Sequence, residues 1–411
     1  MIHDVKDAQA ELDRLAGGAG KGPLSLLRIV AWMFVGLLLI GFAWPVAQPK
    51  YSDNKYNHKI LDPLAKIVTL DKNDTRGFKR PNHGKAFTIA WIGPSTLQSI
   101  SKTSYTFIPA DVRKRIPVID GRNVVVDIYF LSGARIMDLY AATQAALHSH
   151  ADMIVLDLNP LWVYNDTELQ GWSNLNGLTA SHIIKSPSQW SLGAQFFSPE
   201  DVLTGLAATK IPAIRDRWTY AQKVRNHLSW FSVLNEKTPP PSSGPLSPLQ
   251  QVAAMTDPLQ FWVKYRFSPT AKNQSIADRQ LAFLQGANLS GGTISDDVVS
   301  HLFGILAGAK IPAYVYVPPL SQTALKDPRF SASLAKIENH LAAQAAQHPG
   351  PLLLVNSQSL GRVLPPMEFN DIVHVAKDGP MVTYLAHAIC NHLLNTKTVQ
   401  HCVVLPPTKA K

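Results

Sequence analysis

The sequence predicts an α/β domain built on a parallel sheet flanked by helices, with a helical, aromatic-rich insertion and an N-terminal transmembrane helix. Three observations lead to this prediction. Near-continuous apolar runs of strand length alternate with amphipathic helical segments, as in parallel sheets covered on both faces. A long, tryptophan-rich stretch interrupts this alternation, and an uncharged apolar run lies near the N-terminus.

The uncharged run, IVAWMFVGLLLIGFAWPV, covers residues 29–46. About 18 residues at a 1.5 Å rise nearly cross a hydrocarbon core of roughly 30 Å. A cleaved signal peptide is disfavoured, because a long polar stretch precedes the run and no small-x-small cleavage site follows it. We therefore expect a cytoplasmic segment at 1–28 and a single-pass anchor at 29–48 in the inner (cytoplasmic) membrane. The remainder would face the periplasm or the cell exterior.

Residues 49–84 are rich in Lys, Asn and Asp, and we interpret them as a stalk before a catalytic domain at 85–411. Three apolar runs in the first half of that domain predict buried strands, at 86–93, 124–130 and 152–159. An amphipathic helix is expected between the second and third runs, at 134–147. The second half predicts helices at 295–309, 330–347 and 380–394, and strands at 311–319 and 351–357.

The insertion at about 160–294 breaks the strand–helix rhythm. It holds six of the nine tryptophans, namely Trp162, Trp172, Trp190, Trp218, Trp230 and Trp262. These rings are expected mainly to form the core of a small helical subdomain. The alternative is that some of them, with Trp162 and Trp172 as candidates, line a substrate cleft, because aromatic faces suit sugars and acyl chains.

The formal net charge of +10 would suit an anionic partner, but Lys and Arg are scattered, so nucleic-acid binding is not predicted. No nucleotide, flavin or metal signature is present, and we expect neither a cofactor nor a metal. The two cysteines, Cys390 and Cys402, leave two possibilities open. They could close a short disulfide loop if the domain lies outside the cytoplasm, or remain two buried thiols.

Residues that could take part in catalysis follow two of the predicted strands or precede the last predicted helix. Ser95 comes directly after the first strand in WIGPSTLQS, and Asp371 and His374 form a D-x-x-H before the last helix. A serine hydroxyl needs an imidazole to remove its proton, and that imidazole needs a carboxylate to orient it. Three candidate oxyanion donors are the Ser95 amide, the Gly133 amide in LSGAR and the Asn159 side chain in LDLNPLW.

These residues, in this order, resemble the SGNH/GDSL hydrolase superfamily, over most of 86–160 and 310–395. The resemblance implies Ser95, Asp371 and His374 as the catalytic triad, and Ser95, Gly133 and Asn159 as the oxyanion hole. Two blocks depart from the family pattern. The chain has G-P-S where the family usually has G-D-S, and D-L-N-P where the family usually has G-x-N-D.

The anchor, the size and the late D-x-x-H resemble the membrane-anchored cell-envelope acyltransferases of this superfamily, which include the teichoic-acid D-alanylation and the alginate and cellulose O-acetylation proteins. The resemblance implies transfer of an O-acetyl or similar group to a cell-envelope or exported polysaccharide through acyl-Ser95. It also implies a membrane-bound O-acyltransferase or synthase as partner. Two alternatives stay open: an extracytoplasmic esterase or deacylase with the same triad, and an inactive SGNH domain that binds polysaccharide or scaffolds a synthase complex.

Overall fold

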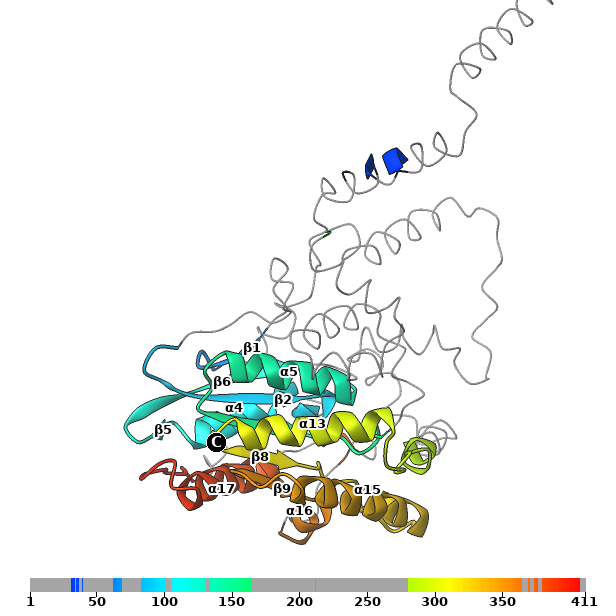
Figure 1. The fold of residues 1–411 in the computed structure, drawn as a ribbon. Coiled ribbons are helices and arrows are strands. Elements are labelled where there is room, and N and C mark those ends of the chain that lie inside the picture. The colour runs from blue at the N-terminus through cyan, green and yellow to red at the C-terminus, as the bar shows by residue number, and fades with distance from the viewer. Residues whose placement is uncertain are drawn as a thin grey trace, which may run out of the picture.

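The computed structural model (Figure 1) describes residues 62–68, 83–100, 105–130, 134–164, 280–363, 373–375 and 379–406, and also residues 31–33, 35, 36, 39, 211 and 369. Most of the predicted anchor at 29–48 lies outside these residues. Its described residues are helical, with Trp32 and Leu39 exposed. No helix within the described part of the chain is long and apolar enough to cross a membrane.

A seven-stranded sheet forms the centre of the described structure. Its strands are β1 (Ala65–Ile67), β2 (Phe87–Gly93), β5 (Val118–Ile119), β6 (Arg122–Phe130), β7 (Met153–Asp157), β8 (Ala313–Tyr316) and β9 (Leu352–Val355). They lie in the order β1-β6-β2-β7-β8-β9, and every pair along this order is parallel, whereas β5 pairs antiparallel with β6. The predicted, mostly parallel α/β sheet flanked by helices is therefore confirmed.

The strand order determines where a ligand site can form. Counted along the chain, the five strands β6-β2-β7-β8-β9 have the order 2-1-3-4-5 of a doubly wound sheet. In such sheets the connections leave β2 and β7 in opposite directions, and a crevice opens between them at their carboxyl ends. Ser95 follows β2 and Asn159 follows β7, so both lie at this switch point.

Helices cover both faces of the sheet. They are α4 (Ile108–Arg115), α5 (Ile136–His148), α13 (Ile294–Gly308), α14 (Gln322–Leu325), α15 (Pro328–Ala346), α16 (Ser357–Val363) and α17 (Gly379–Asn395). One hydrophobic cluster joins α5, α13 and α15 to one face, and a second joins α4 and α17 to the other. Strands β2 and β7 are buried along their whole length, which explains why their sequences are apolar without alternation.

Part of the predicted stalk belongs to the sheet. Ala65 of β1 pairs with Val126 of β6, so residues 62–68 form an edge of the domain. Asp62 fixes this edge, because its carboxylate accepts hydrogen bonds from the Leu64 amide and from the guanidinium of Arg113 in α4. The sequence did not predict β1, because three residues are too few to show a period. Helix α4 and the short hairpin of β3 (Gln98–Ile100) and β4 (Tyr105–Phe107) were also missed.

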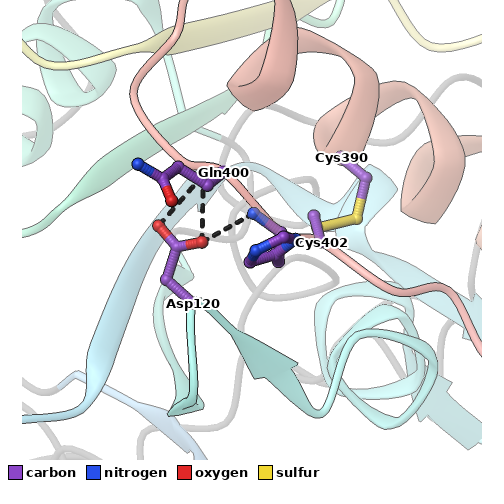
Figure 2. Close-up of a disulfide and its surroundings, with 5 residues drawn as sticks. Asp120, Cys390, Gln400 and Cys402 are labelled. Carbon is purple, nitrogen blue, oxygen red and sulfur yellow. Dashed lines mark hydrogen bonds between the residues drawn. A yellow bond between two sulfur atoms is a disulfide. The ribbon is translucent and has the colours of Figure 1, made fainter.

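The two cysteines form a disulfide, which decides between the two possibilities that the sequence left open. Cys390 on α17 is bonded to Cys402, and the β-bridge of Cys402 with Ile119 holds the C-terminal segment against β5. Figure 2 shows the carboxylate of Asp120 beside this bond, directed at the backbone of Gln400. The segment after α17 is therefore tied to the sheet by both a covalent bond and hydrogen bonds.

Candidate active site

Ser95 is presented by a sharp turn at the end of β2. The strand ends at Gly93, and Ser95 is the first residue of a short 3-10 helix, η1 (Ser95–Leu97). A Cβ atom at Gly93 would lie 2.8 Å from the Cβ of Asp157 and 2.9 Å from the Leu97 side chain, so glycine is required there. Ser95 is partly exposed, whereas Thr96 and Leu97 are buried. Thr96 and Leu97 thus anchor the turn in the core, and the Ser95 hydroxyl stays accessible.

His374 reaches Ser95 from the other end of the chain. Its Nε2 lies 2.9 Å from the Ser95 Oγ, across a separation of 279 residues. The imidazole is only 5% exposed, and its neighbours Val373 and Val375 are buried in the two hydrophobic clusters on opposite faces of the sheet. A β-bridge between Phe369 and Val375 adds a further constraint. Packing on both sides therefore fixes the backbone from which His374 projects.

The Ser95–His374 pair has the geometry of a nucleophile and its base. For Nε2 to accept the Ser95 proton, a neutral imidazole carries its own hydrogen on Nδ1, which an acceptor must then hold. Asp371 is the predicted acceptor, and it lies outside the described residues. The assignment of all three residues as a triad therefore stays a prediction.

Asn159 is held at the carboxyl end of β7. Its side chain is buried, and its Oδ1 accepts a hydrogen bond of 3.0 Å from the Leu161 amide, while its carbonyl accepts one from the Trp162 amide. Because Oδ1 is used in this turn, the Nδ2 group is the part of the amide left to donate to a ligand. Gly133, the other predicted donor, lies outside the described residues.

Trp162, which follows β7, packs against the hydrophobic cluster that contains α5 and α13. The guanidinium carbon of Arg135 lies 3.6 Å from the centre of the Trp162 ring, and Phe283 contacts this ring with centroids 4.3 Å apart. Arg135 precedes α5 and Trp162 follows β7, so the segments that flank β2 on its two sides meet here. With one face of its ring covered by Arg135, Trp162 offers a substrate only its remaining surface. Trp172 lies outside the described residues.

Asp157 is a buried acid next to the turn that carries Ser95. The sequence did not predict it as a site residue. Asp157 is the last residue of β7 and is 0% exposed. Its Oδ2 accepts hydrogen bonds from the Thr96 hydroxyl at 2.9 Å and from the Tyr316 hydroxyl at 3.2 Å. Burial raises the pKa of Asp157 to about 7, against the opposing effects of these two hydroxyls and of the charge on His374. An acid in the otherwise apolar run MIVLD was the available signal.

Comparisons with known proteins leave the family open. A scan against protein-family models finds no match to this chain, and a search of curated proteins finds no relative with significant similarity. Within the described residues, no group of three or more His, Cys, Asp or Glu side chains is arranged to hold a metal ion. The fold and the side chains at the switch point are therefore the basis for a functional assignment.

Proposed function

We propose that this protein is an SGNH-type enzyme that transfers an acyl group, O-acetyl or similar, to a cell-envelope or exported polysaccharide through an acyl-Ser95 intermediate. The observation that carries the proposal is the 2.9 Å contact between His374 Nε2 and Ser95 Oγ. It is supported by the position of both residues at the carboxyl edge of a doubly wound sheet, where ligands bind in such folds. Asn159 beside them is a fitting oxyanion donor.

In the first half of the reaction, Ser95 Oγ attacks the acyl carbon of a donor ester. His374 Nε2 takes the hydroxyl proton as the new C–O bond forms, and the carbonyl electrons move onto the oxygen. The Nδ2 group of Asn159 and backbone amides stabilise this oxyanion. When the intermediate collapses, the bond to the leaving group breaks, and the imidazolium returns its proton to the departing oxygen.

The second half repeats these steps with an acceptor. A sugar hydroxyl gives its proton to His374 Nε2 and attacks the acyl carbon of acyl-Ser95. The Ser95 oxygen then leaves and recovers the proton. Water in place of the sugar hydroxyl gives the esterase reaction with the same residues. The inactive-scaffold alternative is less favoured, because a Ser95 hydroxyl already hydrogen-bonded to an imidazole is arranged as an activated nucleophile.

The disulfide supports a location outside the cytoplasm. Disulfides form and persist in oxidising compartments and are rare in the cytosol, where thiols are kept reduced. The Cys390–Cys402 bond is formed in the domain that also carries Ser95 and His374. We therefore propose that this domain works on the outer side of the inner (cytoplasmic) membrane, beside a membrane-bound O-acyltransferase or synthase that supplies the acyl donor.

The test uses the purified full-length chain in detergent with p-nitrophenyl acetate, with and without an acceptor oligosaccharide. We expect ester turnover and an acetyl adduct on Ser95 by mass spectrometry. Ser95→Ala and His374→Ala should each lower turnover on the order of a thousandfold or more, because nucleophile and base act as a unit. Acetylated oligosaccharide would identify a transferase, and hydrolysis alone would identify an esterase.

Ser149→Ala is the matched control. Ser149 is a buried serine whose hydroxyl bonds Tyr129 and the carbonyl of Ala146 at the end of α5 rather than an imidazole. This variant should keep wild-type turnover. A folded wild type that neither turns over the ester nor reacts with a fluorophosphonate at Ser95 would overturn the enzymatic proposal in favour of the scaffold.

A further inference from the structure

Asp157 is a buried carboxylate, and only one of its two oxygens has a hydrogen-bond partner within the part of the chain that the structure describes. Its Oδ2 accepts the hydroxyls of Thr96 and Tyr316, while its Oδ1 has no hydrogen-bond partner among the described residues. A buried polar atom without a partner is destabilising, and more so when it carries charge. An uncompensated group of this kind in a native core calls for a role other than stability.

The carboxylate lies directly beneath the turn that carries Ser95. The Cβ of Asp157 fills the space beside Gly93, and Thr96, which bonds Oδ2, is the residue after Ser95. From the neighbouring strand β8, Tyr316 stands in register with Asp157 and donates the second hydroxyl. Asp157 therefore connects the nucleophile turn to the centre of the sheet.

The same carboxylate interacts with His374 through charge. A positive charge on His374 favours the ionised form of Asp157, because the opposite charges attract each other. The other titratable side chain acting on it is Tyr316, whose own pKa is raised chiefly by burial and further by Asp157. Thr96 on η1 is uncharged, so among the described residues His374 and Tyr316 are the titratable groups that act on Asp157.

The free-energy cost of burying Asp157 in the folded chain increases as pH rises. Its pKa in the folded chain is raised from 3.8 to about 7, so between these values the folded state holds a proton that the unfolded state has released. Stability therefore falls as pH rises through this window, and the full cost is present above about pH 7. A neutral isostere would remove this cost.

We propose that Asp157 is a positioning residue for the Ser95–His374 pair. It fixes the Ser95 turn through Thr96, and its negative charge stabilises the imidazolium that forms when His374 takes the Ser95 proton. This inference rests on the proposed acyl-transfer function and deepens it. It assigns a role to the position at which the chain departs from the usual glycine of the SGNH pattern.

The test measures the rate of acetylation of Ser95 against pH in the full-length chain. Asp157→Asn keeps the shape and the two hydroxyl contacts but removes the charge. We expect the plateau rate to fall about tenfold to a hundredfold. The rise of the wild-type rate with ionisation of Asp157 near pH 7 should be absent from this variant, because the charge that stabilises the imidazolium is then missing at every pH. The melting temperature should rise relative to wild type, by more at pH 8 than at pH 5.

Two further variants separate the contributions. Thr96→Val removes the hydroxyl that links Asp157 to the Ser95 turn, and should lower the rate while the rate still rises as Asp157 ionises. Asp127→Asn is the matched control. Asp127 is another buried carboxylate whose pKa is raised chiefly by burial, but it bonds His83 and lies within β6. Its loss should leave the pH profile of acetylation unchanged.

An Asp157→Asn chain with wild-type rate and pH profile would overturn the inference. So would a pH profile that Asp127→Asn moves equally, since that would reflect general loss of buried charge. Failure of the proposed function is distinguishable from both results, because the wild-type chain itself would then not be acetylated.

Discussion

Polar side chains at the amino edge of the sheet have different surroundings from those at its carboxyl edge. At the amino edge, the turn between β5 and β6 has positive φ at both Asp120 (47°) and Gly121 (74°), which suits a tight hairpin of the Asp-Gly type. The Asp120 carboxylate accepts hydrogen bonds from the amides of Gln400 and His401. Both of its oxygens bond backbone N–H groups, which ties the C-terminal segment to the hairpin.

Other acids at the amino edge are equally well satisfied. Asp152, just before β7, accepts a hydrogen bond from the Thr88 amide on one oxygen and from the Arg122 guanidinium on the other. The Arg122 guanidinium also lies 4.7 Å from the centre of the Phe87 ring. Each contact joins the start of one strand to its neighbour. This edge is arranged to stabilise the sheet.

At the carboxyl edge, the polar groups are arranged at the expense of stability. Asp157 is buried with one oxygen that no described residue bonds, and the Ser95 hydroxyl is directed at His374 rather than into a backbone cap. Sites that bind and react commonly carry such costs, which the rest of the fold must offset. We therefore expect that substitutions which weaken the amino edge leave ester turnover intact, whereas small changes at the carboxyl edge should remove it.

Gly93→Ala should have the largest combined effect, because it should lower both stability and ester turnover. The added Cβ would overlap Asp157 and Leu97, and the Ser95 turn would have to move. We expect a destabilisation of about 1–3 kcal/mol from overpacking, and loss of most ester turnover even in the folded fraction. Denaturant unfolding and active-site labelling of the same sample would check both. Normal labelling of a folded Gly93→Ala chain would show that the turn is not required.

Removing the Cys390–Cys402 disulfide should have the next largest effect, confined to stability. A loop of about this length contributes roughly 2–4 kcal/mol, because the bond limits the unfolded chain. The double variant Cys390→Ala, Cys402→Ala should unfold at lower denaturant concentration. Its turnover per folded molecule should match wild type, as measured by titrating Ser95 with a fluorophosphonate. A fall in turnover per labelled site would show that the amino edge also affects turnover, against the distinction between the two edges.

Asp120→Ala should have the smallest effect of the three. It removes the solvent-exposed hydrogen bonds to Gln400 and His401 and places an alanine at positive φ, which together cost roughly 1–2 kcal/mol. Asp120→Asn, which tolerates that φ better, should cost less. Thermal unfolding of the two variants would check this order. Equal losses would mean that the carboxylate charge, rather than the backbone conformation, carries the stabilisation.

The sequence alone predicted the main strands and helices, because their period or continuous apolar character is a local property. It also placed Ser95 at the end of one strand and Asn159 at the end of another, and the parallel pairing of β2 with β7 makes these two ends neighbours. Residues 62–68 were assigned to a stalk, because a short edge strand such as β1 is recognisable only by its pairing with β6.

Other features were decided only by the tertiary structure. The contact between Ser95 and His374 spans 279 residues, and no local pattern specifies such a distance. The role of Asp157 depends on the register that sets it beside Tyr316 and below Thr96, since an acid in an apolar strand has no meaning until its neighbours are known. The sequence thus determined which side chains were available for chemistry. The packing of distant strands and loops decided which of them meet, because burial, charge and hydrogen bonding depend on neighbours in space.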